Sequence, residues 1–127
     1  MTVLLDSSAI IHLLEGAHPS SEVVAALLVK EKPLVSWINL GEVFYVVRRR
    51  VGEESAASAL RDLRDVLTTE TPSEARIIEA ARIKSEYAMA YADAFAAATA
   101  VAHEATVWTG DPVLLLPNSP WKWRDLR

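Results

Sequence analysis

Short strand-like segments alternate with helical segments along this chain, and the alternation restricts the fold more than any other feature. Residues 3–5, 34–37, 66–70 and 106–109 have the length and the apolar or β-branched character of strands. The segments between them are long enough for helical crossovers. Strands joined by such crossovers form a parallel sheet with helices on both faces. We therefore predict an α/β fold with a central parallel sheet of four to five strands.

Capping residues and helix breakers set the expected limits of the helices. Gly16 and Gly52 stand where two helices should stop, since glycine is common just after helix C-termini. Ser20 or Ser21 is the expected N-cap of the second helix, and Asn39 that of the third. The six expected helices span residues 8–15, 20–31, 39–51, 53–67, 72–87 and 92–104.

Two tryptophans alternate with two basic residues in the C-terminal tail, in the order Trp121, Lys122, Trp123, Arg124. Side chains two residues apart share a face of an extended segment, so both indoles would lie on the same face. We expect this tail to pack as an edge strand. The alternative is that the indoles stack on nucleic-acid bases.

Composition limits the domain count and the chemistry. The 127 residues suffice for one core, and no linker or internal repeat divides them, so a single domain over residues 1–127 is expected. The absence of cysteine excludes disulfides, thiolate metal sites and thiol nucleophiles. No signal peptide is visible, and the apolar runs 23–29 and 94–102 are too short to span a bilayer. A cytoplasmic protein without membrane contact is expected.

Four acidic residues occupy matching places, where a strand ends or the next helix begins: Asp6, Glu42, Asp93 and Asp111. Asp6 and Asp111 follow strands, whereas Glu42 and Asp93 are expected in the first turns of helices. In a parallel sheet all these carboxylates would converge at one end. At about 6 Å and an effective dielectric constant of about 20, each like-charged pair would cost about 3 kcal/mol. Such a cluster needs protons or a divalent cation.

The residue types favour a hard cation at this cluster. Carboxylates without cysteine or suitably spaced histidine favour Mg²⁺ or Mn²⁺, and such a cation suits phosphodiester hydrolysis. His12, His18 and His103 are expected in structural or surface roles. The net charge of −4 speaks against a basic nucleic-acid surface, but the four acids account for the whole deficit. Taken singly, each acid also fits a helix-cap, helix-start or turn role, and only their joint placement favours a site.

Four motifs around these acids resemble those of PIN-domain ribonucleases, and the chain resembles a VapC-type toxin of a type II toxin–antitoxin pair. The motifs are Leu5-Asp-Ser-Ser-Ala-Ile-Ile, Asn39-Leu-Gly-Glu-Val, Ala92-Asp-Ala-Phe-Ala-Ala-Ala-Thr-Ala and Thr109-Gly-Asp. The resemblance implies a three-layer α/β/α fold and Mg²⁺- or Mn²⁺-dependent endonucleolytic cleavage of RNA. It also implies a homodimer and inhibition by a VapB-like antitoxin.

The resemblance also assigns roles to individual residues. Asp6, Glu42, Asp93 and Asp111 match the acidic quartet that binds metal and catalyses cleavage, with Asp6 and Asp93 as the principal ligands. The supporting polar residues are Ser8 and Thr109.

The chain departs from the family pattern at two places. The family often has Ser or Thr three residues before the third acid, where this chain has Ala90. It commonly has an Asp-Phe pair shortly after the fourth acid, where this chain has Pro-Val-Leu-Leu-Leu at residues 112–116.

Two other functions remain open at the level of sequence. A receiver-type signalling domain would need a second acid beside Asp6 and an acceptor Asp after the third strand, where only Asp65 or Glu70 is near. A catalytically silent PIN-like module, which binds RNA or a partner without turnover, would keep the same motifs.

The helices carry more large apolar side chains than one face against a thin sheet needs. We expect part of this surface to hold an amphipathic antitoxin helix. The alternative is that the residues form the core and a homodimer interface, above all Phe44 and Val47. The set comprises Ile10, Leu13, Leu14, Val43, Phe44, Val46 and Val47.

Overall fold

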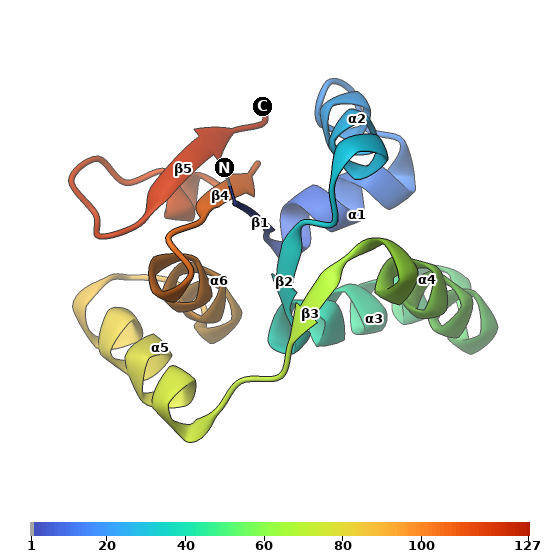
Figure 1. Cartoon of the computed structure of the whole chain (residues 1–127). Coiled ribbons are helices and arrows are strands. Elements are labelled where there is room, and N and C mark those ends of the chain that lie inside the picture. The colour runs from blue at the N-terminus through green and yellow to red at the C-terminus, as the bar shows by residue number, and fades with distance from the viewer. Residues whose placement is uncertain (1) are drawn as a thin grey trace.

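In the part of the chain that the structure describes, five parallel strands form one sheet in the order β3-β2-β1-β4-β5 (Figure 1). The computed structural model describes residues 2–127. The predicted parallel α/β fold is confirmed, and its strands are β1 (Val3–Leu5), β2 (Leu34–Ser36), β3 (Thr68–Glu70), β4 (Thr106–Thr109) and β5 (Lys122–Asp125).

Within residues 2–127, six α-helices and one short 3₁₀ helix, η1, connect the strands. In the sequence, α1 to α4 lie between β1 and β3. In space, α5 and α6 lie together on the opposite side of the sheet from these four helices (Figure 1). The helices are α1 (Ser7–Glu15), α2 (Ser20–Lys30), α3 (Trp37–Val51), α4 (Glu53–Val66), α5 (Glu74–Glu86), α6 (Tyr91–Ala102) and η1 (Pro112–Leu114).

The sheet divides two hydrophobic cores. Leu4 of β1 faces α6 on one side, where seven successive residues from 94 to 100 are buried. The small alanine side chains of α6 allow its backbone to lie close to the sheet. Val3 and Leu5 face the other side, where they pack with α1 and α3. This alternation follows from the two-residue repeat of side chains along a strand.

The glycine stops are confirmed, but the expected N-caps are wrong. Gly16 and Gly52 end α1 and α3 with φ of +65° and +97°, which other residues adopt only with strain. At the start of α3, Ser36 accepts a hydrogen bond from the Ile38 N–H at 3.2 Å, so the helix begins two residues before Asn39. The strand ends at a serine that can cap by itself, which leaves Asn39 free to lie inside the fold.

Neither Ser20 nor Ser21 caps α2. Pro19 occupies the N-cap position and makes no side-chain capping bond. The Ser20 hydroxyl lies 3.2 Å from His12 Nδ1 and donates to the Ala17 carbonyl at 3.4 Å. The Ser20 hydroxyl therefore bonds to α1 and to the loop after it, and not to the first N–H groups of α2.

The C-terminal tail forms the predicted edge strand. Strand β5 pairs with β4, and its four residues are exposed. Trp121 precedes the strand and is buried, with its Nε1 donating to the Leu114 carbonyl at 2.9 Å. Trp123 stays exposed and donates to the Leu116 carbonyl at 3.1 Å. The two indoles therefore differ in burial, and the predicted edge strand is confirmed at residues 122–125.

The apolar residues of the first and third helices divide between core and surface. Ile10 and Val43 are buried in the core between the sheet, α1 and α3, as the alternative prediction for these residues has it. Leu14, by contrast, is exposed at the end of α1. In residues 2–127 no helix combines the length and the apolar character needed to cross a membrane.

Candidate metal centre at the carboxyl edge of the sheet

Asp6 lies at the end of β1 and caps α1. It is only 1% exposed, and its Oδ1 accepts a hydrogen bond from the Ala9 N–H at 2.9 Å. The Ser8 hydroxyl donates to both carboxylate oxygens, at 2.8 and 3.0 Å, and the Thr109 hydroxyl donates to Oδ2. Burial raises the pKa of Asp6, and these hydrogen bonds oppose that rise by favouring the charged form.

The two hydroxyls that bind Asp6 also hold the turn that carries Asp111. The Asp111 N–H donates to Thr109 Oγ1 at 2.9 Å, and the Gly110 N–H donates to Ser8 Oγ at 3.1 Å. A Cβ at Gly110 would lie 3.1 Å from a ring carbon of His12, so a larger residue would require the His12 ring to shift by a few tenths of an ångström. The structure thus links the ends of β1 and β4 through side-chain hydroxyls.

Glu42 and Asp93 reach the same edge from helices. Because α3 begins at Trp37, Glu42 lies in the second turn rather than the predicted first turn. One Glu42 oxygen, Oε1, is buried without a hydrogen-bond partner. Asp93 is the third residue of α6, whose cap position, Ala90, makes no side-chain bond. The departure from the family pattern at residue 90 therefore leaves this helix end without a capping hydroxyl.

The charges of the four acids act on one another. Burial raises the pKa of Asp93 to about 7, and the negative charges of Asp111, Glu42 and Asp6 add to the rise. The strand order explains why these acids lie near one another. From β1 the chain adds β2 and β3 on one side of the sheet and then β4 and β5 on the other side, so the direction in which strands are added reverses between β1 and β4. Parallel α/β sheets form sites at the carboxyl ends of strands beside such a reversal. Asp6 directly follows β1, and Asp111 follows β4 after Gly110.

The histidines lie outside this cluster, as the sequence predicts. His12 contacts Ser20, His18 pairs with Glu22, and His103 lies 2.7 Å from a Glu70 oxygen. Glu70 is also held by Arg76, which donates to both of its oxygens. This acidic residue therefore belongs to an ion-pair network at the edge strand β3.

The donor types at the edge fit a hydrated hard cation. Within residues 2–127, no three histidine or acidic side chains lie close enough together to enclose a metal ion as they stand. Mg²⁺ does not require such a cage, because it keeps several waters and takes one or two carboxylates directly. The unpaired oxygen of Glu42 and the raised pKa of Asp93 mark the carboxylates that a cation would relieve.

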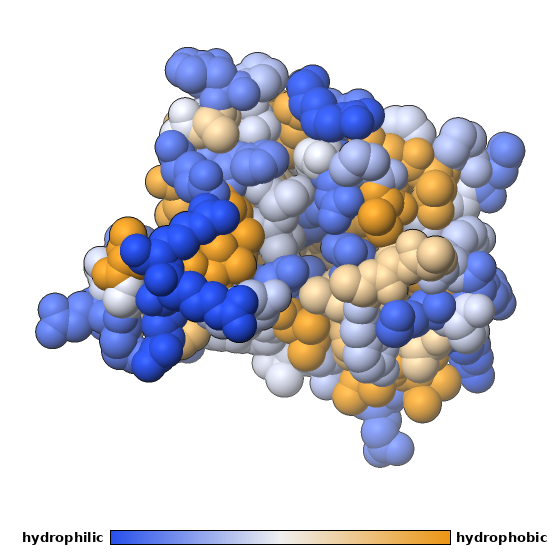
Figure 2. Space-filling view, turned by 180° about the vertical axis from the view of Figure 1, so that it is seen from behind, coloured by the Kyte–Doolittle hydropathy of each residue, from blue (hydrophilic) through white to orange (hydrophobic). Residues whose placement is uncertain are grey.

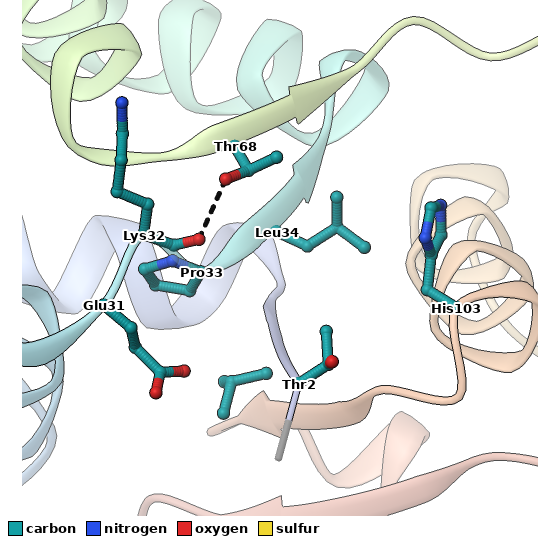
Figure 3. Close-up of a pocket in the computed structure, with 8 residues that line it drawn as sticks. Thr2, Glu31, Lys32, Pro33, Leu34, Thr68 and His103 are labelled. Atoms are coloured by element: carbon teal, nitrogen blue, oxygen red, sulfur yellow. Dashed lines mark hydrogen bonds between the residues drawn. The ribbon is translucent and has the colours of Figure 1, made fainter.

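A separate hollow lies at the opposite end of the sheet (Figure 3). It has a volume of about 330 Å³ and lies beside the starts of β1, β2 and β3. Thr68 donates to the Lys32 carbonyl at 2.9 Å across one wall, which joins the starts of β2 and β3. None of the four clustered acids lines this hollow, so it is distinct from the candidate centre.

Comparison with known proteins identifies the family. Residues 3–115 match the sequence model of the PIN domain. The chain belongs to the PIN domain family. This membership confirms the resemblance seen in the motifs and overturns the receiver-type alternative. Among proteins with curated functions, no match is found.

Several solved structures share the fold of this PIN domain. VapBC2 from Rickettsia felis, bound to a promoter DNA fragment, contains a chain with 17% identity and a TM-score of 0.78, and 100% of each chain is covered. DNA-bound VapBC from Salmonella typhimurium gives 16% identity, a TM-score of 0.78, and coverage of 100% of this chain and 99% of that chain. Mycobacterium tuberculosis VapC20, a sarcin–ricin loop cleaving toxin, gives 18% identity and a TM-score of 0.71. This match covers 87% of this chain and 92% of that chain. At these identities the likeness establishes the fold.

We expect the metal-free PIN domain to lose stability as the pH rises toward 8. The folded pKa of Asp93 is raised to about 7, against an unfolded value of about 3.9. The folded state therefore binds the Asp93 proton more tightly than the unfolded state does. The resulting stabilisation is complete below about pH 4, falls as the pH rises, and is lost once the pH has passed about 7. Thermal midpoints in EDTA at about pH 5.5 and about pH 8 should show the fall. In Asp93→Asn the fall should be smaller, and an equal fall would show that other groups cause it.

Proposed function

We propose that the protein is a VapC-like toxin, an Mg²⁺- or Mn²⁺-dependent endoribonuclease that a VapB-like antitoxin inhibits. Residues 1–127 form its single PIN domain, and two copies form a homodimer. The observation that carries the proposal is that the charges of Asp6, Glu42 and Asp111 all act on Asp93 in a chain of the PIN family. The structural neighbours support it, since they include VapBC complexes and a toxin that cleaves the sarcin–ricin loop.

The acids and hydroxyls have different parts in the proposed site. Asp6 and Asp93 are the principal ligands of the cation, and Glu42 and Asp111 complete the acidic set. When bound, the cation supplies an activated water and stabilises charge on the leaving oxygen of an RNA phosphodiester. The hydroxyls of Ser8 and Thr109 orient the Asp6 carboxylate, because both donate to it. Orientation before substrate arrives lowers the cost of reorganisation during the reaction.

A silent PIN-like module that only binds RNA or a partner is the alternative. One observation favours catalysis over silence: the buried Glu42 oxygen has no partner in the protein. An unpaired polar atom of this kind destabilises a fold, and a module without a metal-dependent reaction would gain nothing from it.

The test is cleavage of ribosomal RNA by purified protein. We expect endonucleolytic products in Mg²⁺ or Mn²⁺, no products in EDTA, and recovery when excess metal is added back. The same RNA incubated with an Asp93→Asn preparation controls for contaminating nucleases. RNA binding without cleavage in any metal would favour the silent module.

The antitoxin surface in this proposal lies between α1 and α3. Leu14, Val46, Val47 and Val51 line a shallow apolar hollow there, and the Arg50–Glu15 ion pair at 2.5 Å borders it. Leu14 also lines a second hollow against α4. Figure 2 shows the back of the molecule, where apolar patches emerge between strongly hydrophilic side chains. An amphipathic antitoxin helix would cover such a surface and could bring a basic side chain to the acids.

Leu14→Arg should weaken inhibition by the antitoxin and leave RNA cleavage unchanged. Leu14 is 43% exposed and joins both hollows, so a charge there places an unpaired cation in the proposed contact. Loss of one central apolar contact weakens binding by about 30-fold. Val29→Arg on α2, at a side chain 88% exposed and outside both hollows, is the matched control.

The antitoxin itself should be encoded by a neighbouring gene. We expect a short protein with a DNA-binding N-terminal part, and we expect its co-expression to suppress cleavage. Equal inhibition of the Leu14→Arg and Val29→Arg variants would reject the surface. A neighbour that co-purifies without inhibiting would reject the toxin function and leave the nuclease function in place.

A further inference from the structure

One buried amide joins the segments that carry three of the four acids. Asn39 is fully buried in the first turn of α3. Its Nδ2 donates to the Ser7 hydroxyl and to the Ala92 carbonyl, both at 3.1 Å. The Ser7 hydroxyl in turn donates to the Asn39 backbone carbonyl at 3.3 Å. The side chain therefore contacts the start of α1 and the start of α6 from α3.

These contacts lie next to the acids. Ser7 directly follows Asp6, and Ala92 directly precedes Asp93. Glu42 lies three residues after Asn39, a spacing that places two side chains on the same face of a helix. Asn39 is thus positioned to fix the relative placement of three carboxylates without holding a charge or a proton itself.

The hydrogen bonds also determine which way the amide is turned. The Ala92 carbonyl can only accept, so the NH₂ group must face it. The other amide atom, Oδ1, is then buried without a partner. A leucine, which has the same branched skeleton, would not bury an unpaired oxygen here. Packing alone therefore does not explain an asparagine here, whereas joining two segments by N–H donors does.

We propose that Asn39 is a positioning residue that holds the starts of α1, α3 and α6 together so that Asp6, Glu42 and Asp93 face one cation. This inference rests on the proposed metal-dependent function. Mutual repulsion of the carboxylates tends to separate these segments in the metal-free protein, and the amide opposes that separation. Without it the acids would remain in the chain but would meet the cation with poorer geometry.

The experiment compares Asn39→Leu with Thr99→Val. Thr99 is also fully buried and polar, but its hydroxyl bonds only to the Phe95 carbonyl of its own helix. Two quantities are measured: Mn²⁺ affinity, from the electron paramagnetic resonance signal of free Mn²⁺, and the thermal midpoint in EDTA. Removing a group that orients metal ligands weakens affinity about 10–100-fold, and we expect this for Asn39→Leu. Thr99→Val should bind Mn²⁺ as the wild type does, even where its thermal midpoint falls.

Ser7→Ala provides a second, milder variant, because it removes one of the two acceptors of the amide. We expect its Mn²⁺ affinity to fall between those of the wild type and Asn39→Leu. Wild-type affinity in folded Asn39→Leu would overturn the inference, and if that variant does not fold, wild-type affinity in Ser7→Ala would do so. Absence of Mn²⁺ binding by the wild type would overturn the proposed function and this inference with it.

Discussion

Asp6→Asn and Asp93→Asn are each expected to abolish metal-dependent RNA cleavage while the fold stays intact. Asp6 is buried among three hydrogen-bonding groups, and Asn keeps its shape while losing the charge that a cation requires. The charges of all three other acids raise the pKa of Asp93, so its neutralisation removes repulsion as well as a proposed ligand. Loss of a metal ligand should lower the cleavage rate at least about 100-fold.

Cleavage rates and thermal midpoints at matched metal concentration measure this effect. Asp65→Asn is the control, because Asp65 is an exposed acid on α4 with the same charge change. We expect wild-type cleavage in the control and no loss of metal-free stability in Asp93→Asn. Wild-type cleavage by either Asp6→Asn or Asp93→Asn would reject the acidic site.

A saturating divalent cation should raise the thermal midpoint by a large amount. A ligand that binds only the folded state stabilises by mass action, which gives about 2.7 kcal/mol at 100 times its dissociation constant. In a domain of this size the corresponding rise is roughly 8–15 °C. The rise should be larger at about pH 8 than at about pH 5.5, since protonation of Asp93 competes with the cation.

Differential scanning calorimetry with Mn²⁺ and with EDTA measures the rise. Asp93→Asn should remove most of it, whereas Asp65→Asn should keep it. A rise of equal size in Asp93→Asn would place the cation elsewhere on the protein. Absence of any rise in the wild type would contradict a metal centre at this edge.

The architecture was predictable because the relevant signals are local. Apolar segments such as residues 3–5 and 106–109 are too short for helices, and the helical segments between them force parallel pairing. The alternation of Trp and basic residues near Trp123 is also a local signal, since a two-residue repeat is typical of a strand, and it indicated the edge strand. Acids that follow parallel strands were then expected at one edge of the sheet, and the negative charges of Asp111, Glu42 and Asp6 contribute to the raised pKa of Asp93.

The details that the sequence could not supply depend on contacts between distant segments. Ser36 and Asn39 are both good N-caps, and only the Ser7 and Ala92 partners decide that Asn39 turns inward. Ile10 and Val43 carry the same helical apolar pattern as Leu14, yet only the packing of α1 against α3 shows which are buried.

The most direct test of the account is sequencing of RNA 5′ ends after a brief pulse of expression in cells, with the intact protein compared with Asp6→Asn. The account predicts new 5′ ends in the cells that express the intact protein, absent from those that express Asp6→Asn at the same level. The same new ends in both samples, or none in either while the intact protein is folded and abundant, would contradict cleavage by the acidic centre.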